Sequence, residues 1–199
     1  MPSNTITGIG SALVDVLINE TDEFLHKLNK EKGGMTYVTS AEQQDIISAS
    51  SQIPVIVPGG AACNTILGVG NLGGTARFIG ARGEDEYGDI FEDKVWECQV
   101  EPVLSYFDTP TGKVLSVVTP DAQRSMFTDL GASSLLDPAD VTSQMFSDTA
   151  IALVEGYLLF NRDLMMAAVK AAKAAGALVA LDLASFEVVN ASQAILPDV

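Results

Sequence analysis

Residues 58–74 read PGGAACNTILGVGNLGG and hold six of the 17 glycines in this 199-residue chain. The glycines at 68–73 form a literal G-x-G-x-x-G, a pattern typical of dinucleotide-binding loops. Such a loop needs its first glycine directly after a strand and its last glycine at the start of a helix. The strand expected here, IPVIV, ends at Val57, well before Gly68. We therefore interpret 61–74 as a helix that a glycine terminates, and the dinucleotide pattern as coincidental.

Within this helix, Gly68 and Gly70 are expected as small residues for close packing, and Gly73 or Gly74 as the C-terminal stop. If the pattern were functional, the chain would be an NAD-dependent oxidoreductase, which is the less favoured interpretation.

The pair Gly59 and Gly60, at the end of the expected strand, is more informative than the later glycines. Glycines at the carboxyl end of a strand let a ligand approach the backbone, and open α/β sheets bind ligands at that edge. Asn64 lies one turn into the expected helix, and its amide can both donate to and accept from a hydroxyl group. The residues alone leave open whether Asn64 binds a ligand or satisfies the backbone of the loop.

Two carboxylates stand next to apolar runs. Asp15 interrupts ALVDVLI, where a buried charge is costly unless something binds it, and its two oxygens could accept from two vicinal hydroxyls of a sugar. The alternative is that Asp15 turns to solvent where the chain leaves the first strand. Asp182 ends the run ALVALDL, at a sheet edge where ligands gather, and a loop-capping role for it is equally open.

Composition limits the classes of partner. The formal net charge of −15 and a pI near 4.2 argue against nucleic acid and against anionic membranes, because phosphate-rich partners need a basic face. The N-terminus has neither the basic nor the apolar segment of a signal peptide, so we expect a cytoplasmic protein. Two cysteines and one histidine are too few for a structural zinc site. Cys63 is expected as a small packing residue and His26 as a solvated one.

The order of patterns along the chain predicts an α/β fold with a small β insertion. Residues 102–128 alternate apolar and polar positions between Pro-containing turns, which favours exposed antiparallel strands. After Pro138 the pattern of a strand, a helix and a parallel strand returns, with Asn161 as the N-cap of a helix that Gly176 ends. A capping box is expected at 40–43, with Ser40 as the N-cap and Gln43 as its partner.

Five blocks in this order make the chain resemble the PfkB/ribokinase-like carbohydrate kinases, in their adenosine-kinase-like branch. The blocks are GIGSALVDVLI, PGGAACNTILGVGNLGG, FIGARGEDEYGDIF, TGKVLSVVTPDAQRSM and LDLASF. The resemblance implies a Rossmann-like, ribokinase-type α/β sheet with helices on both faces and a small β lid. By the same resemblance, 1–199 would be the N-terminal part of such a domain, with lid segments at about 16–38 and 102–128.

The resemblance also implies a function, namely ATP-dependent phosphorylation of a hydroxymethyl group of a sugar or nucleoside, with Mg²⁺. Arg124 would lie near the transferred phosphate or would be a solvated charge of the lid. Met35 and Tyr37 would face the sugar ring or the base. The residues that match the substrate contacts of the family are Asp15, Gly59, Gly60, Asn64 and, less firmly, Ser11.

The chain departs from the family pattern in one important respect. It contains no Gly-Ala-Gly-Asp string, which supplies the anion hole and the catalytic aspartate in the family, and no Asn-x-x-Glu motif linked to Mg²⁺. We therefore expect no catalytic residue and no ATP or Mg²⁺ motif in this chain, and no turnover by the 199 residues alone. The alternative is a non-catalytic sugar- or nucleoside-binding protein. The family pattern leaves a monomer and a lid-mediated homodimer both open.

Overall fold

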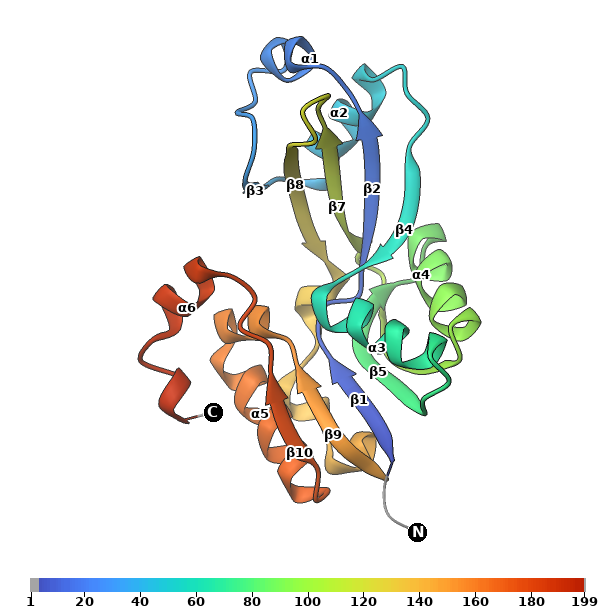
Figure 1. Ribbon diagram of the computed structural model, residues 1–199, viewed down its shortest axis with the longest axis vertical. Coiled ribbons are helices and arrows are strands. Elements are labelled where there is room, and N and C mark those ends of the chain that lie inside the picture. Colours follow the sequence, from blue (N-terminus) through green and yellow to red (C-terminus); the bar gives the residue numbers. More distant parts are fainter. Residues whose placement is uncertain (1–3, 199) are drawn as a thin grey trace.

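The computed structural model describes residues 4–198, in which five parallel strands build a central sheet and five others build a second sheet, the lid (Figure 1). The central sheet has the order β10-β9-β1-β5-β6, and all of its pairings are parallel. Its strands are β1 Thr5–Ile9, β5 Ala76–Gly83, β6 Val100–Phe107, β9 Thr149–Val154 and β10 Leu178–Leu181.

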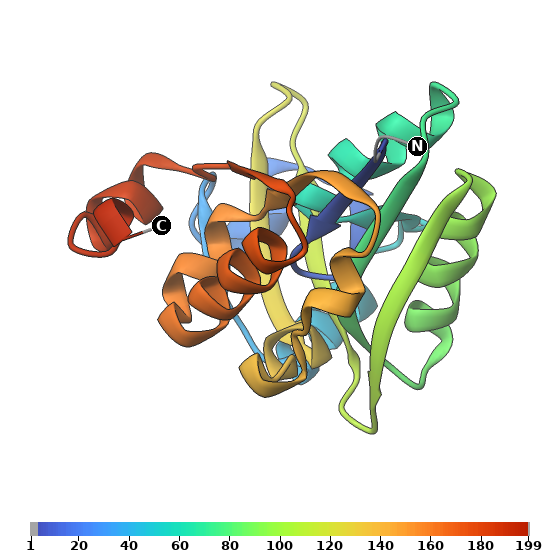
Figure 2. The same ribbon diagram turned by 90° about the horizontal axis from the view of Figure 1, so that it is seen from below.

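Helices cover both faces of the central sheet, because neighbouring residues of each strand point to opposite sides. On one face Phe78 packs with Ile66 of α3 and with Phe91 of α4, whose ring centroid lies 5.7 Å from its own. On the other face Ile79 packs in a separate core with Met165 of α5. Figure 2 shows α4 and α5 on opposite sides of the sheet. The predicted fold class is confirmed. These helices are α3 Ala61–Asn71, α4 Glu86–Glu97 and α5 Arg162–Ala174.

The lid has the order β3-β8-β7-β2-β4 and stands beyond the carboxyl end of β1 (Figure 1). β2 runs parallel to β7 and β3 parallel to β8, while β2–β4 and β7–β8 are antiparallel. Its strands are β2 Leu13–Asn19, β3 Met35–Tyr37, β4 Val55–Gly59, β7 Thr111–Val118 and β8 Arg124–Gly131, and its helices are α1 Asp22–Lys27 and α2 Ser40–Ala49.

Short elements complete the described part of the chain. No helix within residues 4–198 is long and apolar enough to cross a bilayer. The remaining elements are α6 Phe186–Ser192 and the 3₁₀ turns η1 Ala132–Leu135, η2 Pro138–Asp140, η3 Ser143–Phe146, η4 Gly156–Phe160 and η5 Leu196–Asp198.

The strand assignments for the lid need two corrections. β4, expected to belong to the α/β sheet, is an edge strand of the lid and pairs antiparallel with β2. β6, most of which was expected in the lid, pairs with β5 at the edge of the central sheet. β6 is an edge strand with one neighbour, and most of its residues are partly or fully exposed, as those of a lid strand would also be. The segments 16–38 and 102–128 therefore describe the lid sheet only in part.

The interpretation of 61–74 as helix and stop is confirmed. Gly73 follows α3 with a φ of +83°, and its N–H donates to the Gly70 carbonyl at 2.8 Å. A methyl group on Gly70 would lie 2.1 Å from the Cys98 carbonyl oxygen, so this glycine does allow close packing. Gly68 has open space where a methyl group would go, and its expected packing role is wrong.

The helix caps were predicted with mixed success. Asn161 caps α5 by accepting from the Leu164 N–H at 3.2 Å, and Gly176 follows the helix with a positive φ, as predicted. The capping box of α2 is formed by Thr39 and Glu42, one residue before the expected pair. Both pairs fit the same sequence pattern, and only Glu42 carries the stronger, charged acceptor.

Candidate functional site

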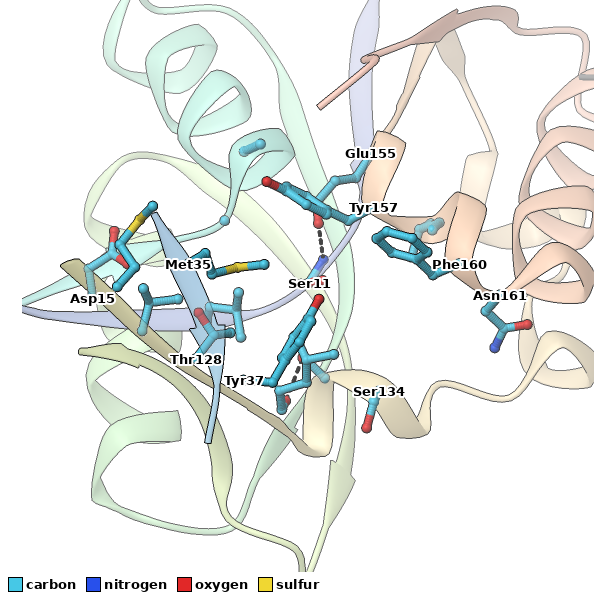
Figure 3. A pocket seen from close by; sticks show the side chains of 18 of the residues that line it. Ser11, Asp15, Met35, Tyr37, Thr128, Ser134, Glu155, Tyr157, Phe160 and Asn161 are labelled. Atoms are coloured by element: carbon cyan, nitrogen blue, oxygen red, sulfur yellow. Dashed lines mark hydrogen bonds between the residues drawn. The ribbon is translucent and has the colours of Figure 1, made fainter. Parts of the chain in front are cut away.

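A cavity of about 630 Å³ lies between the lid and the carboxyl edge of the central sheet. Its walls come from the lid strands β2, β3, β7 and β8, from the start of α3, and from the segments that contain η1 and η4 (Figure 3). The sheet edge and the lid thus enclose a space large enough for a small organic ligand. Its polar side chains include those of Ser11, Asp15, Asn64, Thr128, Ser134 and Glu155.

The structure brings six of the eight sequence-predicted site residues to this cavity. The lining residues among them are Ser11, Asp15, Met35, Tyr37, Gly60 and Asn64. Gly59 lies directly behind Asp15, since a methyl group on it would come within 2.8 Å of the Asp15 carboxyl carbon. Arg124 is exposed at the start of β8 and does not line the cavity.

A row of cross-strand neighbours forms the lid side of the cavity. Tyr37 pairs with Thr128, Thr128 with Val114, and Val114 with Asp15 in the registers of the four strands. All four residues line the cavity. The hydroxyl of Thr128 is buried and has no hydrogen-bond partner within the described residues. Thr128 is therefore a polar position on the cavity wall that sequence reasoning missed.

Asp15 has the electrostatics of a carboxylate held partly away from water. Burial raises its pKa above the ordinary value for an aspartate, and the positive charge of Arg124 opposes that rise. The charge of Arg124 thus acts at this site although its side chain lies outside the lining.

Glu155 is a second cavity carboxylate that sequence reasoning missed. It is 1% exposed, and its two oxygens accept from the backbone N–H groups of Ser11 at 3.2 Å and Ala62 at 3.0 Å (Figure 3 shows the first bond). Burial raises the pKa of Glu155, and the two N–H donors oppose the rise. A usable signal was present, because Glu155 follows the apolar strand AIALV much as Asp15 interrupts its own apolar run.

The close approach of two backbone segments at the cavity explains why residue 60 is a glycine. Gly60 has a φ of +94°, and a methyl group on it would lie 2.4 Å from the Ser11 carbonyl oxygen. A residue with a side chain would be strained there and would collide with the backbone at Ser11, where the chain passes from β1 to the lid. The contact with Ser11 already accounts for the glycine, whereas the sequence argument invoked only the approach of a ligand.

Apolar and aromatic side chains form the rest of the wall. Tyr37 and Met35 come from the lid, and Tyr157 and Phe160 come from η4 on the central domain (Figure 3). Tyr37 and Phe160 remain more than half exposed, at 55% and 59%, so they leave apolar surface for a ligand to cover. Tyr157 and Phe160 had not been predicted.

Cys63, His26 and Asp182, also weighed as functional candidates from the sequence, lie outside the cavity lining. Cys63 is buried, and burial raises the pKa of its thiol, which suits the expected packing role. His26 is exposed on α1. Asp182 accepts from the Ala184 N–H at 3.1 Å, as a loop cap would, while its second oxygen has no partner among the described residues. Nowhere in 4–198 do three His, Cys, Asp or Glu side chains gather as metal ligands.

The model of the pfkB family of carbohydrate kinases matches residues 33–198. The chain belongs to the pfkB family. Its curated relatives include a probable fructokinase-7 from Arabidopsis thaliana, 33% identical over 135 residues, and fructokinase-2 from Zea mays, 30% identical over 138 residues. These matches cover 63% and 64% of this chain but only 38% and 40% of the relatives.

Solved structures of similar fold match this chain over nearly its whole length. The adenosine kinase from Sinorhizobium meliloti has a TM-score of 0.85 and 29% identity, and a probable sugar kinase protein from Rhizobium etli CFN 42 has 0.87 and 28%. These likenesses cover 98% and 100% of this chain and 61% of each of those chains. This pfkB chain therefore spans about three-fifths of those structures and about two-fifths of the curated relatives.

Proposed function

We propose that this pfkB chain forms the acceptor-binding part of an ATP-dependent kinase that phosphorylates a hydroxymethyl group of a sugar or nucleoside. The observation that carries the proposal is the meeting of Asp15, Gly60 and Asn64 in one cavity between lid and sheet. By the resemblance of sequence, these residues match the substrate contacts of the family. Their common location supports a shared ligand.

In the proposed complex the residues of this chain bind and orient the acceptor. The ionised carboxylate of Asp15 accepts hydrogen bonds from two vicinal hydroxyls, which are stronger than bonds between neutral groups. The Asn64 amide binds the same diol, as a donor to or an acceptor from one of its hydroxyls. Glu155 holds the start of α3, and with it Asn64, next to Ser11, where the chain passes from β1 to the lid. The lid residues Met35 and Tyr37 cover the ring or the base.

The chemistry of phosphoryl transfer is not assigned to these residues. ATP and Mg²⁺ would supply the phosphoryl group and the neutralising charge, but the described carboxylates form no cluster that fits a Mg²⁺ ion. Because the string that supplies the catalytic aspartate in the family does not occur in this sequence, the proposal assigns no catalytic base to this chain. We also propose that Arg124 contacts the transferred phosphate. The proposed protein is cytoplasmic and is either a monomer or a homodimer formed through the lid.

Two measurements on the 199-residue chain test the proposal. Calorimetric titration with adenosine, ribose and fructose should detect binding of at least one of them, and Asp15→Ala should weaken it. A coupled assay of ADP release over the same compounds should show no substrate-dependent turnover. Failure of all three compounds to bind would refute the acceptor site. Robust turnover would refute the absence of a catalytic group.

Binding without turnover is also expected for a non-catalytic sugar- or nucleoside-binding protein. A Gly-Ala-Gly-Asp string in the whole protein would favour the kinase over this second candidate. ADP release by a chain extended through the missing motif would distinguish the kinase from the binding protein. The oxidoreductase alternative has lost its basis, since 68–73 lie in α3 and the turn after it.

A further inference from the structure

The described chain crosses between the central sheet and the lid four times, and the crossings meet in two pairs. The crossings from β1 to β2 and from β4 to α3 meet at Glu155, inside the cavity. The crossings from β6 to β7 and from β8 to η1 meet outside the cavity lining, where the Ala132 N–H donates to the Pro110 carbonyl at 2.8 Å. Glu155 bonds to both crossings of the first pair, whereas at the second pair Asp85 bonds to Thr111, where the crossing from β6 enters β7.

Asp85 binds the central domain and the lid at once. It follows β5 and caps α4, because its Oδ1 accepts from the Gly88 N–H at 2.8 Å. The same oxygen accepts from the Thr111 hydroxyl at 2.6 Å, and Oδ2 accepts from the Thr111 N–H at 2.8 Å. A capping residue needs only the first of these bonds. The two bonds to Thr111 go beyond capping and reach the first residue of β7.

Thr111 is fixed from several sides. It is 1% exposed, and its hydroxyl oxygen also accepts from the Gly83 N–H at 2.9 Å, at the end of β5. In the β7–β8 ladder Thr111 is paired with Gly131, the last residue of β8. The start of β7 and the end of β8 are therefore fastened to β5 and α4 at one point.

The position of Thr111 is transmitted to the acceptor site through β7. Val114 lies three residues further along this strand and pairs with Asp15 in the β2–β7 ladder. Both residues line the cavity. A ladder of hydrogen bonds fixes the register of β2 against β7, so a shift of β7 at Thr111 carries Asp15 with it.

We propose that Asp85 is a positioning residue of the acceptor site, acting through Thr111 and β7 to hold Asp15 and the lid wall opposite the start of α3. Asp85 itself does not line the cavity. Its role at the acceptor rests on the proposed function, whereas its hold on the lid does not.

The ionisation of Asp85 suits this role. Burial raises the pKa of its carboxyl group, but the hydrogen bonds from Thr111 and Gly88 and the charge of Lys113 outweigh burial and bring the pKa below the usual range. Asp85 is thus a charged acceptor at neutral pH, and its bonds to Thr111 are charge-assisted.

Two substitutions separate the hold on Thr111 from the capping of α4. Asp85→Asn keeps an oxygen for the Gly88 N–H but turns an NH₂ group toward the N–H of Thr111. Thr111→Val keeps the shape and the N–H but removes the hydroxyl. The matched control is Asp137→Asn, since Asp137 is exposed, caps η2 by accepting from the Ala139 N–H and belongs to the central domain.

The test measures adenosine affinity by calorimetry and amide hydrogen exchange of β2 and β7, at a temperature where circular dichroism shows every variant folded. We expect Asp85→Asn to weaken adenosine binding about five-fold or more, as for the loss of one net hydrogen bond. It should also speed exchange in β2 and β7. Thr111→Val should act in the same direction, the double variant should be no worse than the stronger single one, and the control should match the wild type.

Other outcomes decide against the proposal. If Asp85→Asn lowers the melting temperature but leaves adenosine affinity and exchange in β2 unchanged, Asp85 only caps α4. If Asp85→Asn does not fold, Thr111→Val becomes the deciding variant. Unchanged adenosine affinity and unchanged amide exchange in Thr111→Val would then overturn the proposal. If the wild type binds no adenosine, ribose or fructose, the proposed function fails. Exchange in β2 and β7 then decides alone whether Asp85 holds the lid.

Discussion

The carboxylate of Glu155 accepts a hydrogen bond from the backbone N–H of Ala62 at 3.0 Å and so fixes the first turn of α3 to the end of β9. Its other oxygen accepts from Ser11, where the chain leaves β1 for the lid. One buried side chain thereby joins three segments that are far apart in the sequence. The side chain lies in the cavity wall, so its ionisation state matters for the fold and for the site.

The pKa of Glu155 makes its contribution to stability depend on pH. Burial raises the pKa in the folded protein above that of the unfolded chain. Its stabilising contribution is therefore fully present below the unfolded pKa and is lost as pH rises through the folded pKa, by about 1.4 kcal/mol per pH unit between the two. Urea unfolding of the wild type and Glu155→Gln should show the wild type losing stability relative to the variant over that range.

The matched control for this effect is Glu31→Gln, since Glu31 is exposed in the lid. The stability difference between this variant and the wild type should stay nearly constant over the same range. A pH-independent difference for Glu155→Gln as well would mean that burial does not control the ionisation of Glu155.

Local sequence patterns identified residues that line the cavity better than they predicted the path of the chain around it. Asp15 and Asn64 were found because an isolated charge in an apolar run and an amide after glycines are local signals. Glu155 has the same kind of signal and was overlooked. Thr128 could not have been found, because it reaches the cavity only through the non-local pairing of β8 with β3 and β7.

The assignment of IPVIV shows a physical limit of local patterns. An apolar run of this length predicts a strand buried on both faces, yet the side chains of Val55, Ile56 and Val57 are all exposed, at 57%, 38% and 39%. The run does form a strand, but its partner is β2, more than 30 residues earlier in the chain. Which sheet a strand joins depends on such pairings, and the local sequence does not encode them.

Alanine substitutions at the two glycines within α3 should change the stability of the fold in opposite directions. Gly70→Ala should destabilise the fold by about 1–3 kcal/mol, because the new methyl group would lie 2.1 Å from the backbone oxygen of Cys98. Gly68→Ala should stabilise it by about 0.5–1 kcal/mol, because nothing lies within 4 Å of its methyl group. Thermal unfolding of both variants gives the comparison.

Ligand binding adds an independent check on the same helix. Adenosine affinity of Gly70→Ala, measured where the variant is folded, should stay within a few-fold of the wild type. A selective loss of nucleotide binding with sugar binding intact would instead make 68–73 a nucleotide loop, against its place in α3.

Acceptor affinity should depend on pH through Asp15. Hydroxyl groups donate to its ionised form, so affinity is complete above the pKa of the free protein and falls as pH drops through it. Burial raises that pKa, against the opposing charge of Arg124, so the fall should begin at a higher pH than for an exposed aspartate. Calorimetry at several pH values should show this loss of acceptor affinity in the wild type. Asp15→Asn should lack the part of the loss that comes from protonation of Asp15. An identical pH profile in both proteins would exclude Asp15 as the titrating group.

The final prediction is that Asp15 and Asn64 bind one diol of a riboside or a furanose-like sugar. Both residues line the same cavity, from β2 and from the first turns of α3. Asp15→Ala should cost about 2–4 kcal/mol of acceptor affinity, as two charge-assisted bonds of about 1.5–3 kcal/mol each would with allowance for non-additivity. The exposed lid residue Asp45 gives the control, since Asp45→Ala should bind as the wild type does.

A deoxy analogue completes the cycle for this diol. The wild type should bind 2′-deoxyadenosine or 3′-deoxyadenosine more weakly than adenosine, because one hydroxyl that donates to Asp15 is absent. Asp15→Ala should no longer distinguish the analogue from the parent, and calorimetric titration of both proteins with both ligands measures the coupling directly. If Asp15→Ala bound adenosine normally, or still preferred it strongly over the analogue, the hydroxyls would be bound by other residues and the diol assignment would be wrong.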